Sequence, residues 1–228
     1  MKFIVFGLGN FGASLANKLV ILGHEVIGVD SHHEITEKWK DQITHVITLD
    51  ASSPDAMRTL PLRDVDAVIV AIGEKPGIGI MVAALLKQIG VKRIISRVIT
   101  PLQRTVLETM NVREFADPES DSAERLAYQL DLKGVVNSHR VTDKFGLIDV
   151  EVPGVFEGSK ISEIDFQSEF GITLVTVLRT TEEKNIFGVI HPVRESMGIV
   201  DKKEFVLTKG DTLLLFGEVS KLERFIES

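Results

Sequence analysis

Three glycines near the start of the chain have the spacing of a phosphate-binding turn. They stand in the stretch FGLGNFGASLANKL, after an apolar run and at the start of a segment with helical spacing. In such a turn the first glycine permits a sharp bend, the second lets the backbone approach phosphate oxygens, and the third lets the helix lie close to the strand. The N–H groups at the helix start then face the anion. The expected contacts are Gly7, Leu8, Gly9, Asn10, Phe11 and Gly12.

An acidic residue follows at the distance that this pattern requires. Asp30 ends the next apolar run, EVIGVD, about 20 residues beyond the glycines. A carboxylate there can accept both ribose hydroxyls and repels a 2′-phosphate, which favours NAD over NADP. Ser31 and His32 follow directly and are expected beside the ribose. The alternative for Asp30 is a helix cap without a ligand.

Two later apolar runs also end in residues that are placed to line a ligand. Ligands of open parallel sheets bind beyond the carboxyl ends of the strands. After the third run we expect residues lining an adenine, although this segment could equally be a plain loop with Ser53 capping the next helix. After the fourth run we expect residues covering the phosphates or the ribose. These residues are Asp50, Ala51 and Ser52, then Ala71, Ile72 and Gly73.

The elements that must position these residues alternate along the first half of the chain. Unbroken apolar runs, typical of strands buried on both faces, alternate with segments of helical spacing. This order predicts right-handed crossovers and an α/β fold, a Rossmann-like doubly wound parallel sheet. The expected strands are 2–7, 25–30, 44–50, 66–73, 93–98 and 113–117, and a helix over 118–130 leaves the sheet.

The pattern changes after about Gly134 to mostly β segments. Short helices are expected over Lys160–Phe170 and Ser220–Ser228. We therefore predict two domains, a nucleotide-binding domain over residues 1–134 and a small α+β module over 135–228.

Composition excludes several classes of function. The chain has 228 residues, 44% of them hydrophobic, no cysteine, and a formal net charge of −7. The absence of cysteine removes disulfides and thiolate metal sites. Without a basic half, nucleic acid is not an expected partner. No apolar run approaches the ~18 residues of a membrane span, so we expect a soluble protein with no direct membrane insertion.

Catalytic groups are not visible beside the predicted site. The second half holds two histidines, His139 and His191, neither with a recognisable catalytic partner. A dehydrogenase also needs a domain that holds substrate against the nicotinamide. We therefore predict that the protein is not an enzyme and has no catalytic residue. The alternative is a small NAD-dependent oxidoreductase. A transcriptional regulator would need a helix-turn-helix and a basic face, and the sequence offers neither.

The chain resembles the RCK family, the regulators of potassium conductance. The resemblance runs in order through MKFIVFGLGNFGASLANKLVILGHEVIGVD, LDASSPDAM, DAVIVAIGE, RIISRV and ADPESDSAERLA. It continues in the second half through GSKISEID, GITLVTVLR and LTKGDTLLLFGEVSKLERF. The free-standing two-module form is similar to the cytosolic subunits of Ktr and Trk potassium transporters.

The resemblance implies a function. Such subunits bind adenine nucleotides, form dimers that assemble into a ring, commonly an octamer, and gate a membrane K⁺-translocating subunit. It implies a cytoplasmic protein that reaches the membrane only through that partner. The ligand would be ADP, ATP, NAD or NADH, with AMP as a further option. Some relatives bind a second ligand, such as a cyclic dinucleotide, in the C-terminal module.

Three residues bear on which nucleotide is preferred. Members that respond to ATP often carry Arg after the second glycine, where this chain has Asn10, so a charge-assisted phosphate contact is lost. Arg97 matches a basic position of the family and is expected either to compensate or to form only an ion pair. Glu119 matches a position that holds a divalent cation in some members; the alternative is a carboxylate favoured by the helix dipole.

Overall fold

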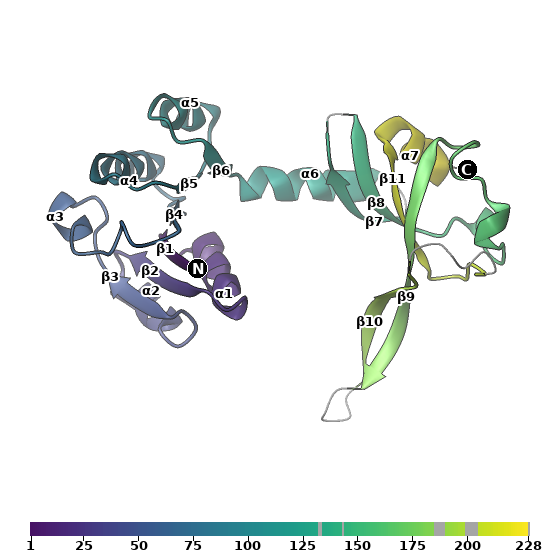
Figure 1. Cartoon of the computed structure of the whole chain (residues 1–228), viewed down its shortest axis with the longest axis horizontal. Coiled ribbons are helices and arrows are strands. Elements are labelled where there is room, and N and C mark those ends of the chain that lie inside the picture. Colours follow the sequence, from purple (N-terminus) through teal and green to yellow (C-terminus); the bar gives the residue numbers. More distant parts are fainter. Residues whose placement is uncertain (132–133, 143, 185–189, 199–204, 228) are drawn as a thin grey trace. The chain divides into compact units, whose positions relative to one another are not determined.

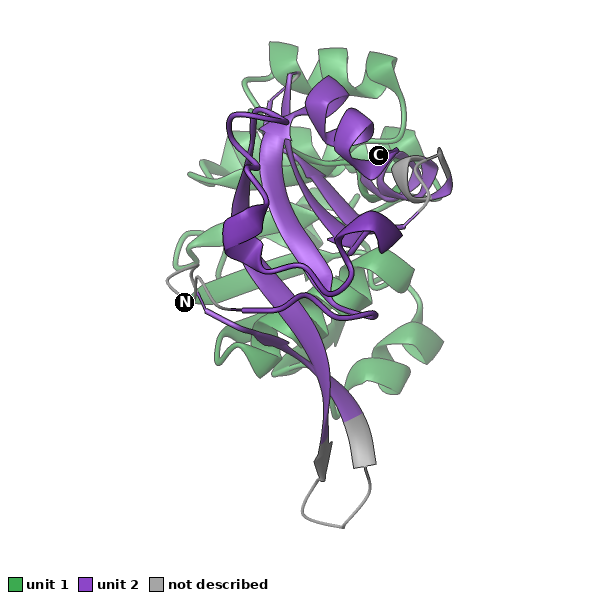
Figure 2. Cartoon of the chain, turned by 90° about the vertical axis from the view of Figure 1, so that its right-hand side faces the viewer, with its two compact units in different colours: residues 1–120 green, residues 121–228 purple. Residues whose placement is uncertain are grey.

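The computed structural model describes residues 1–131, 134–142, 144–184, 190–198 and 205–227. The chain forms two compact units, Met1–Ser120 and Asp121–Ser228, which Figure 2 colours separately. Each unit has its own sheet and its own hydrophobic core, and each is described by itself.

The first unit is built on a six-stranded parallel sheet with the order β3-β2-β1-β4-β5-β6 (Figure 1). All four residues of β4 are buried, as are the last four of β1, which explains why these strands read as unbroken apolar runs. The prediction of a doubly wound α/β fold is confirmed. The strands are β1 Lys2–Phe6, β2 Glu25–Asp30, β3 His45–Thr48, β4 Ala67–Val70, β5 Ile94–Arg97 and β6 Glu114–Ala116.

Helices cover both faces of this sheet. One core cluster contains Ala13 and Ala16 of α1, with Ile35 of α2 packed against it. The other contains Met57 of α3, Leu86 of α4 and, from α5, a buried leucine. The helices are α1 Asn10–Ile21, α2 His33–Trp39, α3 Pro54–Met57, α4 Pro76–Ile89 and α5 Pro101–Thr109.

The strand order reverses between β1 and β4. The chain runs outward from β1 through β2 to β3, then returns to place β4 on the other side of β1. Phe6, at the end of β1, is paired with Val29 of β2 and with Val70 of β4. The carboxyl ends of these strands therefore meet at one edge, where open α/β sheets bind their ligands.

The second unit contains an antiparallel sheet with the order β10-β9-β11-β8-β7. The small α+β module expected for this half is confirmed. Helix α6, Pro118–Asp131, begins in the first unit and continues in the second. The remaining elements are β7 Val135–Arg140, β8 Phe145–Glu151, β9 Ile172–Lys184, β10 Ile190–Ser196, β11 Thr212–Glu218 and α7 Val219–Ile226.

Aromatic side chains fill much of the second core. The ring of Phe225, on α7, stacks on Phe156 at 5.4 Å between centroids and meets Phe170 edge-on at 5.0 Å. The helix expected over Lys160–Phe170 is wrong, because only Ile161–Glu163 forms a short 3-10 turn. The carboxylate of Asp165 accepts the backbone N–H of Ser168 at 2.8 Å, a local bond that competes with helix formation.

No helix in the described part of the chain combines the length and the hydropathy that a bilayer-spanning segment needs.

Candidate functional site

The turn after β1 has the geometry that its glycines predict. Gly7 has φ +89°, in the left-handed region that favours glycine, and its N–H donates to the carbonyl of Val29 at 2.8 Å. A Cβ at Gly12 would overlap the carbonyl oxygen of Gly7 and lie 2.9 Å from the Cβ of Ala71. These two glycines therefore let β1, α1 and the end of β4 approach one another closely.

Gly9 differs from the other two glycines because the space beside it is open. Apart from its neighbours along the chain, no atom of the described residues lies within 4 Å of where its Cβ would stand. Gly9 is the N-cap of α1 and gives the helix no side-chain cap, and the first turn of α1 carries no acidic residue. The N–H groups at the start of α1 are thus left for an external anion. Asn10 is exposed at this end and Phe11 is half-buried.

Asp30 ties the glycine turn to the end of β2. One carboxylate oxygen accepts the N–H of Leu8 at 2.8 Å. The other accepts the backbone N–H of His32 at 2.9 Å and lies 3.1 Å from its Nδ1. The Asp30 side chain is 10% exposed, while Ser31 and His32 are open to solvent, with the Ser31 hydroxyl 3.2 Å from His32 Nδ1. Asp30 therefore shapes the turn, and its largely buried carboxylate lies at the same edge of the sheet.

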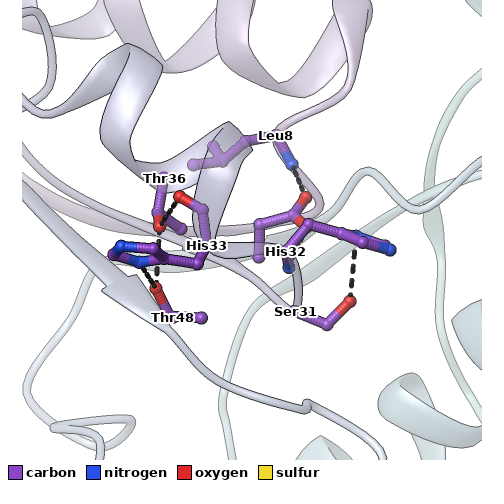
Figure 3. A network of polar contacts seen from close by, with 7 residues as sticks. Leu8, Ser31, His32, His33, Thr36 and Thr48 are labelled. Carbon is purple, nitrogen blue, oxygen red and sulfur yellow. Dashed lines mark hydrogen bonds and ion pairs between the residues drawn. The ribbon is translucent and has the colours of Figure 1, made fainter.

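Figure 3 shows this network and a second one beside it that the sequence analysis missed. The hydroxyls of Thr36 and Thr48 lie 2.7 Å apart, and Thr36 donates to the carbonyl of His33 at 2.8 Å. His33 Nδ1 lies 3.5 Å from the Thr48 hydroxyl. These contacts fasten the start of α2 to the end of β3. No motif marks them in the sequence, because they depend on how α2 packs against β3.

The loop after β3 is ordered by its own side chains. Asp50 accepts both the N–H and the hydroxyl of Ser52, at 2.9 and 2.7 Å, and these bonds lower the pKa of its carboxyl. Ser53 caps α3 by accepting the N–H of Ala56 at 3.4 Å. Ala51 is buried in the core, so only its backbone is left to line a ligand. Asp50 is exposed and Ser52 half-buried at the same edge of the sheet.

The ends of β4 and β5 complete the edge. Ile72 lies against the turn, since a Cβ at Gly7 would be 3.0 to 3.2 Å from its atoms. Gly73 lies under Arg97, whose guanidinium carbon would be 2.8 Å from a Cβ placed there. The same guanidinium is 5.7 Å from the centre of the Phe11 ring. The turn, the loop after β4 and the last residue of β5 therefore lie close to one another.

Arg97 has an acidic partner within the first unit. Its guanidinium pairs with the carboxylate of Glu119, in the first turn of α6. Among the described residues, Arg97 Nε is the buried side-chain atom left without a hydrogen-bond partner. Nowhere in the described ranges do three His, Cys, Asp or Glu side chains gather as a metal site. The predicted cation site at Glu119 stays a prediction, and its observed partner is an arginine.

The absence of a catalytic histidine in the second half stays a prediction. His139 is exposed on β7, and the His191 side chain lies outside the described residues. A well-buried ion pair of the second unit joins Arg179 to Asp211, with Nη2···Oδ2 at 2.6 Å. Burial alone would raise the pKa of Asp211, but hydrogen bonds from Arg179 and Thr208 lower it overall.

Known proteins resemble the chain over most of its length. A family model for the TrkA-N domain matches residues 3–118. Ktr system potassium uptake protein C of Bacillus subtilis (strain 168) is 25% identical over 224 residues, which cover 98% of this chain and 95% of that protein. Ktr system potassium uptake protein A of the same organism is 26% identical over 176 residues, covering 77% and 79%.

Solved structures show the same fold. The GsuK RCK domain superposes with a TM-score of 0.65 at 17% identity, covering all of this chain and 48% of that one. The GsuK channel bound to NAD gives 0.64 at 17% identity, covering 99% and 39%. This chain thus spans less than half the length of these two structures. At this sequence identity, the similarity is evidence for the fold alone.

Proposed function

The chain belongs to the TrkA-N domain family, as its resemblance to RCK proteins predicted, and from this premise we propose that it is a regulatory subunit of a Ktr-type potassium-uptake system. The observation that carries the proposal is the similarity to Ktr system protein C, which extends over 98% of the chain and therefore over both units. A nucleotide bound in the first unit would regulate a membrane subunit that conducts K⁺.

The geometry of the first unit supports an adenine nucleotide as the ligand. The open space at Gly9 and the uncapped start of α1 suit a phosphate, and Asp30 suits a ribose. The GsuK channel has been solved with NAD. We propose residues 1–134 as the nucleotide-binding domain and 135–228 as the C-terminal domain. The proposed contacts are Gly7, Leu8, Gly9, Asn10, Phe11, Gly12, Asp30, Ser31, His32, Asp50, Ala51, Ser52, Ala71, Ile72, Gly73 and Arg97.

We propose that the nucleotide acts as a signal and undergoes no reaction. Both similar Ktr proteins are named for potassium uptake. The alternative, an NAD-dependent oxidoreductase, would consume NADH in the presence of a carbonyl substrate, and its absorbance at 340 nm would fall. Titration calorimetry with AMP, ADP, ATP, NAD and NADH, compared side by side, identifies the ligand.

Oligomerisation is part of the proposal, as a dimer that assembles into an octameric ring in the cytoplasm. Large apolar side chains are exposed on the helices of the chain: Leu102 on α5 is 74% exposed, and Leu126 and Leu130 on α6 are 53% and 77% exposed. Faces of this kind are where symmetric contacts form. Light scattering should give a mass well above the 25.2 kDa of one chain; a monomer at micromolar concentration, with and without nucleotide, counts against the ring.

The deciding experiment measures K⁺ flux through proteoliposomes that contain a Ktr-type membrane subunit and this protein. Flux should differ between saturating ADP and saturating ATP, because a ligand regulates only when its affinity differs between two states. Asp66→Ala, which alters a carboxylate that accepts the Lys2 N–H at the opposite end of β1, should leave this difference unchanged. Flux that ignores nucleotide while the subunit is bound would contradict the proposal.

A further inference from the structure

The second unit contains a cavity with an apolar floor and a charged wall. Its volume is about 450 Å³, within the range of sites that hold small molecules. The apolar floor consists of Gly146 and Ile148 of β8 and of Val219 and Leu222 of α7. Ile148 is 7% exposed and Leu222 is 2% exposed, and both belong to the core cluster of this unit. The cavity therefore reaches the hydrophobic core.

Helix α6 contributes most of the charged wall. Its residues in the lining are polar or charged: Asp121, Ser122, Glu124 and Arg125. Two leucines of the same helix, Leu126 and Leu130, are exposed and stand outside the lining. The described apolar side chains of α6 therefore do not cover the floor. Apolar surface is stabilised by contact with another apolar group, so the floor favours a ligand with an apolar portion.

The wall carries charges of both signs. Arg140 of β7 lies with its Nε 3.4 Å from Oε1 of Glu124, and the two side chains are 43% and 48% exposed. An ion pair this exposed is weak and gives way to a better partner. Asp121 and Arg125 stand one helical turn apart in the same wall. With His139 counted as neutral, the two arginines and two carboxylates of the lining cancel in formal charge. The wall therefore favours a ligand that carries one group of each sign.

We propose that this cavity binds a free α-amino acid with an apolar side chain. Arg125 and Arg140 receive its carboxylate, because a guanidinium binds a carboxylate through two parallel hydrogen bonds. Asp121 and Glu124 accept hydrogen bonds from its ammonium group, and its side chain lies on the apolar floor. An aliphatic acid or amine of the same size compensates only one sign of the wall. This inference goes beyond the proposed function and does not depend on the nucleotide site.

The test is titration calorimetry on the full chain with L-leucine and two analogues that each lack one charge. The analogue 4-methylpentanoate keeps the carboxylate and the side chain of leucine but lacks the ammonium group. The analogue 3-methylbutylamine keeps the ammonium group and the side chain but lacks the carboxylate. Wild type should bind L-leucine about tenfold more tightly than either analogue, because each analogue loses charge-assisted hydrogen bonds.

Two variants test the wall and the floor separately. Arg125→Gln should weaken the binding of L-leucine about tenfold, through the loss of a charged donor. Gly146→Ala should weaken it about fivefold, because the added methyl occupies part of the floor. That methyl would lie 3.6 Å from the carbonyl oxygen of His139 and 3.8 Å from Cγ2 of Val219, which are ordinary contacts that the fold tolerates. The control is Arg224→Gln on α7, whose guanidinium donates to the carbonyl of Glu169 at 3.1 Å, and it should leave the affinity unchanged.

Three results would overturn the inference. The first is wild type that gives no binding heat with leucine, valine or phenylalanine at millimolar concentration. The second is 4-methylpentanoate that binds as tightly as L-leucine, because the ammonium group is then not recognised. The third is a Gly146→Ala protein that keeps its affinity for L-leucine but has a lower mass in light scattering, because the cavity is then an interface between copies of the chain. A protein that binds L-leucine as expected and no nucleotide contradicts the proposed function and leaves this inference standing.

Discussion

Removing the carboxylate of Asp30 should lower both the stability of the protein and its affinity for nucleotide. The two effects can be measured separately. The side chain accepts the N–H of Leu8 at 2.8 Å and that of His32 at 2.9 Å. In Asp30→Ala the N–H of Leu8 loses its acceptor in a part-buried place, whereas His32 is exposed and its N–H can turn to water. A hydrogen bond to a charged group contributes about 1.5–3 kcal/mol. We expect the free energy of unfolding to fall by about 2 kcal/mol.

The effect on the ligand adds to the effect on stability. If the same carboxylate accepts ribose hydroxyls, its loss should weaken the binding of ADP and NADH about 10- to 100-fold. Asp30→Asn separates the two effects, because its amide oxygen can still accept one backbone N–H while the charge is gone. The Asp30→Asn variant should therefore lose less stability than Asp30→Ala. It should lose nearly as much affinity for ADP and NADH.

Urea unfolding gives the stability of each variant, and calorimetry gives its affinity. The control, Asp66→Ala, deletes a carboxylate that accepts the N–H of Lys2 at 2.7 Å, at the far end of the same strand. It should cost some stability and leave nucleotide affinity unchanged. An Asp30→Ala protein that unfolds like wild type and binds ADP within twofold would refute both parts of the reasoning.

Three further predictions follow from single contacts. Gly12→Ala should lower the free energy of unfolding by about 3 kcal/mol or more in urea denaturation, because its methyl overlaps the carbonyl of Gly7; an unchanged midpoint would contradict the observed turn. Asn10→Arg should raise the preference for ATP over ADP in calorimetry, because a guanidinium can pair with the extra phosphate; an unchanged ratio would mean that residue 10 does not face the phosphates. The folded-state pKa of Asp211 is lowered overall, although burial opposes this, because Arg179 donates to it. Its ion pair therefore stabilises the fold above the unfolded pKa of about 3.9 and stops doing so as pH falls through the lower folded value. The stability difference between wild type and Asp211→Asn should be full at pH 7 and shrink below pH 4, and a constant difference would exclude this origin.

The parts of the site that the sequence predicted are those where one local pattern has one physical cause. A strand buried on both faces must be apolar, and a turn at φ +89° against a neighbouring loop needs a glycine such as Gly7. The order of strands and helices along the chain then followed from the alternation of apolar runs with segments of helical spacing. The expected helix over Lys160–Phe170 failed because apolar spacing does not reveal that Asp165 will bond to its own backbone.

Contacts between distant segments could not be predicted in this way. Arg97 and Glu119 come together because β5 and β6 are paired and α6 begins directly after β6. The threonine pair of α2 and β3 depends in the same way on how α2 returns along the sheet. Asp30 was expected to bind a ribose. That its carboxylate also accepts the N–H of Leu8 is seen only in the folded turn.

The place of the cation near the glycine turn depends on the fold and not on the turn itself. A basic residue at position 10 would stand on the turn. Here that position is the neutral Asn10, and the charge stands on β5, where Arg97 pairs with Glu119 of α6. Arg97 reaches Phe11 and Gly73 because β5 is paired with β4, which lies beside β1 in the sheet. Under the proposed function, a nucleotide bound at the turn can regulate only by as much as its contacts differ between two states of the protein.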